Sequence, residues 1–475
     1  MFSSPLFLFV FLPCVLALHL AGGKWLRNTV LLLASLLFYA WQEQVIVLVL
    51  LLSIAVNHVT ALAIERRANG PPARGLLAAS LTFNLGLLIA FKYSNWIHTQ
   101  LSSLGLIFGL GELPPLPEIP LPIGISFFTF QAMSYVVDVY RGEVRVHRNP
   151  LHFATYLALF PQLIAGPIVR YRDLAAELAE RRVDLAGFSY GVRRFLIGLG
   201  KKLLVADTLA VVSDRIFEVP PGEHSAALAW LGITCYTLQI YFDFSGYSDM
   251  AIGLGRMFGL RFLENFNFPY IAQSVTEFWR RWHISLSTWF RDYLYVPLGG
   301  NRAGRLRTYG NLLIVFFLCG LWHGASWNFV VWGLFHGFLL VVERLGGARL
   351  LSRVPRVIGH AYLLLAVMIG WVFFRAPDLG YAVDFLASLV GFSRTPPGAY
   401  PIAVYLDPVA ATALAAGALG SLPWLPRLRA RLAHAPQAPR VAFETVALLG
   451  QLMIFFAVAA KLAVGTYSPF IYFRF

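Results

Sequence analysis

The sequence predicts an all-α membrane protein with about twelve transmembrane crossings. Of its 475 residues, 58% are hydrophobic and only 13% are charged, which excludes a soluble globular protein of this length. The hydrophobic residues gather in runs of roughly 17 to 25 residues, the length of a helix that crosses a bilayer. We therefore expect one integral-membrane domain over residues 1–475.

Apolar runs in the first third of the chain place spans near 3–20, 28–42, 45–64, 75–96 and 121–138. Basic clusters follow the first, third and fifth spans, whereas the connection after the fourth carries no lysine or arginine. Because basic loops stay on the cytoplasmic side, this alternation predicts an extracytoplasmic N-terminus. No basic region precedes the first run, so a cleaved signal peptide is disfavoured.

The segment 151–169 departs from this pattern. It contains Pro161, Gly166 and Pro167 and is basic on both flanks. This composition favours a re-entrant or broken helix supported by neighbouring protein, and a proline-kinked span is an equally good alternative.

Further spans are expected near 203–217, 226–247, 309–325, 327–343, 357–375, 402–422 and 441–464. The run 381–392 is too short to cross and is expected in the outer interface. An even number of crossings places both termini outside. The two parts of the chain share no self-similar motifs, which disfavours a transporter built on internal repeats.

The net charge of +14 comes mainly from residues between the apolar segments. Loops on the cytoplasmic side explain it, so nucleic-acid binding is not expected. Cys14, Cys235 and Cys319 lie apart in apolar surroundings and are interpreted as small core residues, since their spacing fits neither a metal site nor a disulfide framework.

The densest group of polar residues lies within 276–302. On a helix its aromatic residues share one face, and beside them runs a narrow polar stripe of Arg280, His283, Ser287 and Arg291. This predicts an amphipathic helix at the cytoplasmic interface, where tryptophans and arginines can simply anchor to lipid. Alternatively, Arg280, Arg281 and Arg291 bind the phosphates of an anionic ligand such as a coenzyme A thioester.

Two histidines lie in the apolar run 312–342. A neutral, buried imidazole can take a proton from a hydroxyl nucleophile, and Trp322 and Trp327 would give His323 a dry slot for an acyl group or a thin chain. His336 is about 20 Å further along a straight helix, so the two can meet only if the chain turns back near 324–328. Two plainer interpretations remain. In one, His336 is a hydrogen-bonded core residue. In the other, His323 forms a hydrogen bond to a neighbouring helix that packs closely against Gly320 and Gly324.

A further polar cluster, 241–250, includes Asp243 and Ser245 at the expected end of a span. The plain explanation of these polar residues is that their side chains cap the end of that helix. Lining a substrate pocket is the alternative.

Together these segments resemble the membrane-bound O-acyltransferase family. The residues that carry the resemblance are FWRRWHISLSTWFRDYLYVPLGGNR, GLWHGASWNFVVWGLFHG and YFDFSGYSDMAIG, with QAMSYVVDVYRGE and FPQLIAGPIVRY before them. They are most similar to the bacterial polysaccharide-acetylating branch that contains the alginate O-acetylation membrane subunit. The resemblance implies a ring of tilted spans around a thin core where funnels from both sides meet.

The resemblance also implies a reaction. An acetyl group from cytosolic acetyl-CoA, with no bound cofactor and no metal, would pass through the bacterial inner membrane toward an exported polysaccharide such as alginate. His323 matches the family's catalytic histidine, and His283 matches a second family position. Expected partners are an extracytoplasmic serine esterase-like (SGNH-type) acetyltransferase, the polysaccharide synthesis and export complex, and membrane lipid.

The last six residues, 470–475, resemble a C-terminal extracytoplasmic aromatic motif of this branch. In it a tyrosine, here Tyr472, is proposed to accept the acyl group before a partner serine does. A tyrosyl ester would retain transfer potential because phenolate is a good leaving group. An aromatic anchor at the outer interface is the plainer interpretation.

Two other classes of protein fit the composition. A transporter or flippase would move a lipid-linked sugar or acyl carrier without consuming a thioester. A scaffold of a polysaccharide synthase complex would tolerate substitution of both histidines.

Overall fold

The computed structural model describes residues 2–67, 70–117, 119–302, 304–393, 399–465 and 470, apart from the side chains of Lys24 and Trp25. Throughout these residues the regular secondary structure is helical, with no strand. The predicted all-α class is confirmed.

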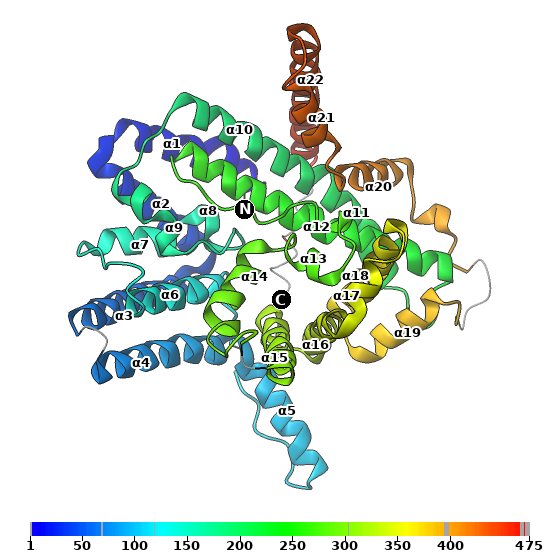
Figure 1. Cartoon of the computed structure of the whole chain (residues 1–475), viewed down its shortest axis with the longest axis horizontal. Coiled ribbons are helices and arrows are strands. Elements are labelled where there is room, and N and C mark those ends of the chain that lie inside the picture. Colours follow the sequence, from blue (N-terminus) through cyan, green and yellow to red (C-terminus); the bar gives the residue numbers. More distant parts are fainter. Residues whose placement is uncertain are drawn as a thin grey trace.

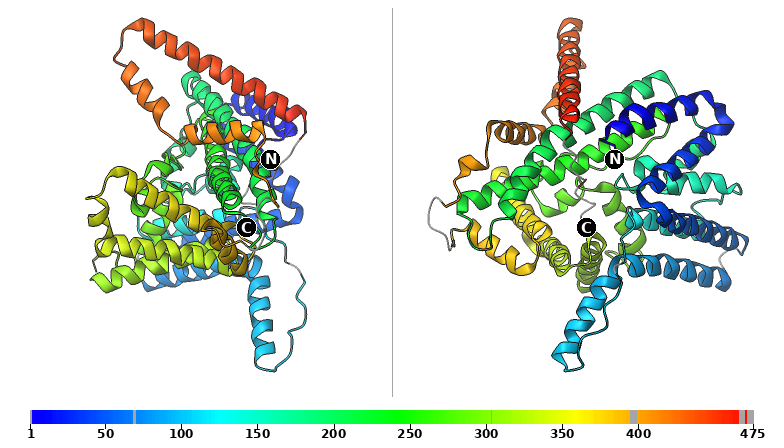
Figure 2. Two further views of the ribbon diagram at one scale, coloured as in Figure 1. Left: turned by 90° about the vertical axis from the view of Figure 1, so that its right-hand side faces the viewer. Right: turned by 180° about the vertical axis from the view of Figure 1, so that it is seen from behind.

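The helices of the first third lie side by side along one flank of the molecule (Figure 1). Their bounds are η1 (Phe7–Phe11), α1 (Leu12–Ala21), α2 (Gly23–Glu43), η2 (Gln44–Ile46), α3 (Val47–Arg66), α4 (Pro71–Leu88), η3 (Ile89–Tyr93), α5 (Ser94–Ile107) and α6 (Ile125–Tyr140). The π-helical turn η3 joins α4 to α5, and α5 then projects away from the body (Figures 1 and 2).

The segment 151–169 is broken, as one of the two alternatives predicted. It forms α7 (Pro150–Ala158) and α8 (Phe160–Leu163), both largely buried. Side chains from distant helices satisfy its free backbone groups: the N–H of Phe160 donates to Ser35 Oγ at 3.1 Å and that of Ile168 to Ser285 Oγ at 3.0 Å. Irregular backbone is tolerated here because protein surrounds it.

The middle of the chain supplies the central helix. Its elements are α9 (Tyr171–Ala179), α10 (Leu185–Gly200), η4 (Lys201–Ala206), α11 (Asp207–Phe217) and α12 (Ala226–Met257). α12 is 32 residues long and buried over most of its length. The cluster 241–250 therefore lies inside a helix, and the expected helix end with its own caps is not found.

The predicted continuous helix over 276–302 is wrong. After η5 (Pro269–Ile271), which precedes this region, the chain forms α13 (Val275–Trp279), α14 (Ile284–Phe290) and η6 (Arg291–Tyr295), with a break between α13 and α14. At the break His283 has left-handed dihedral angles (φ 43°, ψ 54°). Contacts with other elements impose this turn, and periodicity alone does not reveal it.

The remaining elements begin with the hairpin α15 (Arg305–His323) and α16 (Trp327–Val342), which confirms the predicted turn near 324–328. Gly320 and Gly333 let the two helices touch: a Cβ on Gly320 would lie 2.2 Å from the carbonyl oxygen of Phe329. The helices that follow are η7 (Glu343–Gly347), α17 (Ala348–Leu351), α18 (Arg356–Arg375), α19 (Leu379–Leu389), η8 (Ile402–Val404), α20 (Pro408–Gly420), α21 (Trp424–Leu432) and α22 (Gln437–Ala463).

The described helices include five that are long and apolar enough to cross a membrane, or six if the bent pair α20 and α21 counts as one. The protein is thus a multi-pass membrane protein, but single helices do not reach the expected number of about twelve. Several expected spans form short, kinked or more polar helices such as α11 and α15. The α21–α22 hairpin projects from the edge opposite α5 (Figures 1 and 2).

Candidate active site

His323 is the last residue of α15 and lies in the interior, only 5% exposed. The helix ends here because Gly324 is extended and Ser326 caps α16 through its hydroxyl. The following turn therefore leaves the imidazole at the closed end of the hairpin.

Three aromatic rings surround the imidazole of His323. The ring centroids lie 4.9 Å away for Trp322, 4.9 Å for Trp332 and 5.2 Å for Phe374. Aromatic rings surround His323 as expected, but Trp332, and not the predicted Trp327, accompanies Trp322 in this role. Trp327 instead is half exposed and contacts Trp96 on α5.

His283 is fully buried, whereas Arg280 in the same turn is exposed. The left-handed backbone separates the two, so the expectation that His283 shares a face with the arginines is wrong. Its ring packs edge-on against Phe244, 4.6 Å between centroids.

Asn265 fixes the tautomer of His283. The Asn265 Oδ1 atom accepts from the backbone N–H of Ser285 at 3.2 Å and from its hydroxyl at 2.9 Å, which identifies this atom as the amide oxygen. The same oxygen lies 3.2 Å from His283 Nδ1. Nδ1 therefore carries the hydrogen and Nε2 carries the lone pair. Among the described residues Nε2 has no hydrogen-bond partner.

Trp322 lies between the two histidines. Its ring centroid is 6.0 Å from that of His283 and 4.9 Å from that of His323. The indole N–H is buried and has no acceptor in the described part of the chain. A donor and two imidazoles thus converge on one small region.

Two cavities approach this region from different elements and share no lining residue. The smaller one, of about 100 Å³, is lined by His323 and Trp322 together with Lys92 and Ser126. The larger one, of about 1380 Å³, lies among α10, α12, α20 and α21. Asn265 lines it and bonds to His283, whereas His323 lines the smaller cavity.

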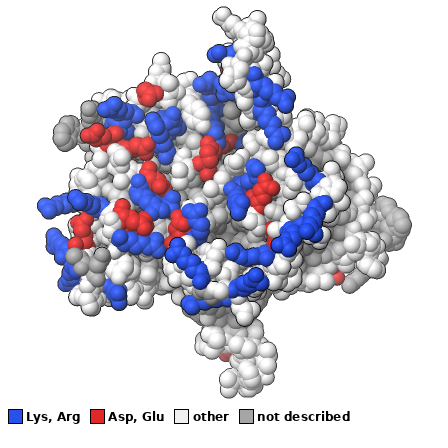
Figure 3. Space-filling view, viewed as in Figure 1, with Lys and Arg blue, Asp and Glu red and all other residues white. Residues whose placement is uncertain are grey.

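The predicted arginines lie outside both cavities. Arg281 pairs with Glu277 at 2.8 Å, and Arg291 pairs with Asp292 at 2.7 Å with its side chain 61% exposed. The structure therefore places them on the surface, and each paired carboxylate reduces the charge available to a ligand. Lysine and arginine side chains are spread over much of the face seen in Figure 3, with acidic residues among them.

Asp243 and Ser245 have different surroundings. Ser245 lines the larger cavity. Asp243 belongs to a buried ion cluster, in which Lys202 Nζ lies 2.8 Å from Asp243 and 2.7 Å from Asp207. Such a cluster compensates buried charges, and Asp243 lines neither cavity.

Tyr472 lies outside the described residues. Phe470, two positions earlier, is buried, with ring centroids 4.9 Å from Tyr247 and 6.0 Å from Phe244. Because Phe244 also contacts His283, a single side chain separates Phe470 from His283.

His336 is also buried, and its ring lies 5.2 Å from that of Trp332. Both His336 and His323 therefore contact Trp332, from opposite arms of the hairpin. Neither ring nitrogen of His336 has a hydrogen-bond partner among the described residues, so a hydrogen-bonded core histidine is not what the structure shows.

Sequence reasoning missed Asn265 and Lys92. Asn265 lies in an irregular segment whose pattern gives no signal. For Lys92 the sequence does give a signal, because this lysine lies within the expected span 75–96. Ionisable residues at that depth in a membrane indicate a function.

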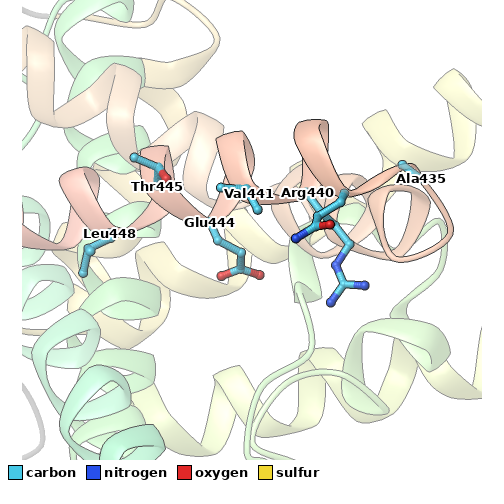
Figure 4. A pocket seen from close by; sticks show the side chains of 7 residues that line it. Ala435, Arg440, Val441, Glu444, Thr445 and Leu448 are labelled. Atoms are coloured by element: carbon cyan, nitrogen blue, oxygen red, sulfur yellow. The ribbon is translucent and has the colours of Figure 1, made fainter.

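A separate hollow of about 600 Å³ lies on the projecting hairpin, along α22 (Figure 4). It is open and is lined by Arg440, Glu444 and Leu448, among others. None of the residues singled out by the sequence lines it.

Comparison with known proteins identifies the family. The model of the membrane-bound O-acyltransferase family (MBOAT) matches residues 141–374, a segment that contains both His283 and His323. The chain is 42% identical to the probable alginate O-acetylase AlgI of Pseudomonas putida over the whole of both chains. It is 36% identical to the peptidoglycan O-acetyltransferase of Helicobacter pylori, over 83% of this chain and 80% of that protein. The teichoic acid D-alanyltransferase of Bacillus subtilis is 32% identical over 46% of this chain and 58% of that protein. The chain therefore belongs to the membrane-bound O-acyltransferase family and is an O-acyltransferase.

Proposed function

We propose that this enzyme passes an acetyl group from cytosolic acetyl-CoA across the bacterial inner membrane, for O-acetylation of an exported polysaccharide such as alginate. The relatives named for alginate and peptidoglycan O-acetylation support a glycan as the final acceptor. The observation that carries the proposal is the placement of His323 and His283 on either side of one ring, that of Trp322, with His323 lining one cavity and His283 bonded to a residue that lines another.

In the proposed reaction His323 is the general base. It takes the proton from an acceptor hydroxyl as the oxygen forms a bond to the thioester carbon. The C–S bond then breaks, and the leaving thiolate receives the proton from His323. The enzyme returns to its starting state with no other reactant.

The neighbouring groups have proposed supporting roles. The indole N–H of Trp322 donates to the carbonyl oxygen as it gains charge, in a region from which protein side chains exclude water. His283 presents the lone pair of Nε2, set by Asn265, as an acceptor for an amide N–H of the donor's pantetheine arm, and in this way orients the incoming thioester. Ser245 lines the path by which the donor enters.

The face rich in lysine and arginine is proposed to face the cytosol (Figure 3). Arg280, Arg281 and Arg291 remain candidates for the donor phosphates, because a bound phosphate can compete with Glu277 for Arg281 and with Asp292 for Arg291. The C-terminal motif 470–475 is proposed to be extracytoplasmic, because the sequence predicts an even number of crossings and an extracytoplasmic N-terminus.

Tyr472 is proposed as the first acceptor. Phe470, two positions earlier in the sequence, supports this proposal, because it is buried beside Phe244 and Tyr247, and Phe244 contacts His283. A partner with a nucleophilic serine would then take the acetyl group from the phenolic ester. The polysaccharide synthesis and export machinery would supply the polymer.

The test uses purified enzyme with acetyl-CoA carrying a labelled acetyl group. We expect thiol release and labelling of the protein, loss of both in His323→Ala, and loss of labelling alone in Tyr472→Phe if water serves as the remaining acceptor. His434→Ala, an exposed histidine between α21 and α22, is the matched control and should behave as wild type. Wild-type protein that releases no thiol would favour the transporter, and a fully active His323→Ala variant would refute the assignment of the base.

A further inference from the structure

The end of α15 leaves three backbone carbonyls that its own helix cannot satisfy. The last carbonyls of any helix lack an intrahelical donor, and here Gly324 is extended, so the helix does not continue. The carbonyls belong to Leu321, Trp322 and His323. In an apolar interior such groups are costly unless another element supplies donors.

Two adjacent residues of η3 supply these donors. Tyr93 Oη donates to the carbonyl of Leu321 at 2.6 Å. Lys92 Nζ donates to the carbonyl of Trp322 at 2.6 Å and to that of His323 at 3.1 Å. Nζ also lies 3.4 Å from Ser126 Oγ. One π-helical turn thus caps the helix that carries the proposed base.

The charge of Lys92 suits this position. A cation at the C-terminal end of a helix is stabilised by the partial negative charge of the free carbonyls. No carboxylate lies within ion-pair distance of Lys92 among the described residues, so those carbonyls are its principal partners. Lys92 and His323 also line the same small cavity.

We propose that Lys92 is a positioning residue for the acyl-transfer reaction. It holds the backbone of Trp322 and His323, and thereby directs the imidazole of His323 and the indole of Trp322 into the small cavity. Tyr93 acts in the same way on Leu321, two residues further from the base. The inference rests on the proposed function, because it assigns to Lys92 the placement of the catalytic base.

The experiment compares Lys92→Met, Lys92→Gln, Lys92→Arg and Tyr93→Phe by thiol release from acetyl-CoA, measured as kcat and KM. We expect kcat of Lys92→Met to fall roughly 10 to 100-fold, the effect of a displacement near 1 Å, with KM for the donor nearly unchanged. Lys92→Arg should restore most of kcat, and Tyr93→Phe should lose less than Lys92→Met. Unfolding temperature and membrane content are measured for every variant.

Lys92→Gln keeps the experiment decisive if Lys92→Met does not fold, because its amide can still donate to both carbonyls without a charge. A purely structural role predicts wild-type kcat in every variant that folds, and that result would overturn the proposal. Equal kcat in the arginine and glutamine variants would also overturn it, since the cation would then have no part. Failure of the proposed function is distinguishable, because wild-type protein itself would release no thiol.

Discussion

Replacing Gly320 with alanine tests whether the closeness of α15 and α16 holds His323 in place. The added Cβ would lie 2.2 Å from the carbonyl oxygen of Phe329 and 3.0 Å from its carbonyl carbon, and both obstacles are backbone atoms that cannot rotate away. An ordinary contact is near 3.4 Å, so the helices must separate by roughly 1 Å in a close-packed interior. Gly320 is only one turn before His323.

Overpacking of this kind costs about 1 to 3 kcal/mol in the free energy of unfolding. A shift near 1 Å at the base would lower kcat by about 10 to 100-fold. Gly310→Ala is the matched control: it lies on the same helix with nothing within 4 Å of its added Cβ, so it should keep both stability and activity. Thiol release and thermal unfolding in detergent measure the two effects. Wild-type kcat in Gly320→Ala, or an equal loss in Gly310→Ala, would refute the argument.

Three further predictions follow from the contacts around the site. Asn265→Ala leaves the Ser285 N–H and His283 Nδ1 without their acceptor, so we expect a loss of about 2 to 4 kcal/mol in unfolding free energy and lower kcat, whereas Gln437→Ala at an exposed position of α22 should change neither. Glu343 accepts from the N–H of Val275 at 2.6 Å and from that of Thr276 at 2.9 Å. Glu343→Ala should therefore lower the free energy of unfolding by about 2 to 4 kcal/mol, measured by thermal unfolding. Glu444→Ala breaks an exposed ion pair and should lower it by less than about 1 kcal/mol. Phe470→Ala should lower the transfer of labelled acetyl to an outer acceptor at least severalfold, because the buried ring at position 470 is lost. Phe456→Ala, on the exposed face of α22, should leave this transfer unchanged. Equal transfer in the two variants would contradict a role for Phe470.

Hydropathy and turn residues predict the local features of this fold well. The break within 151–169 follows from its prolines and glycine, and the α15–α16 turn follows from the polar residues between two apolar runs. These are short-range effects, so the residues that cause them are adjacent in the sequence. The number of crossings is harder to predict, because helices surrounded by protein can be shorter and more polar than a helix that meets lipid.

The site is predicted in part. The position of His323 follows from an ionisable residue in an apolar run, but the orientation of His283 depends on Asn265, 18 residues earlier, and on the ring of Phe244. A helical projection of 276–302 contains neither residue. The arginines, in contrast, are conspicuous in the sequence but line neither cavity, and two of them, Arg281 and Arg291, are in ion pairs.

The left-handed backbone at position 283 ties the fold to the proposed chemistry. Most side chains there strain the backbone by roughly 1 kcal/mol or more, and glycine would adopt the same angles freely. The imidazole is nevertheless fully buried, hydrogen-bonded to Asn265 and packed against Phe244, so its removal would leave a cavity and an acceptor without its donor. These losses exceed the strain that glycine would relieve. Selection for heat resistance alone is therefore expected to retain the same side chain that the proposed reaction uses.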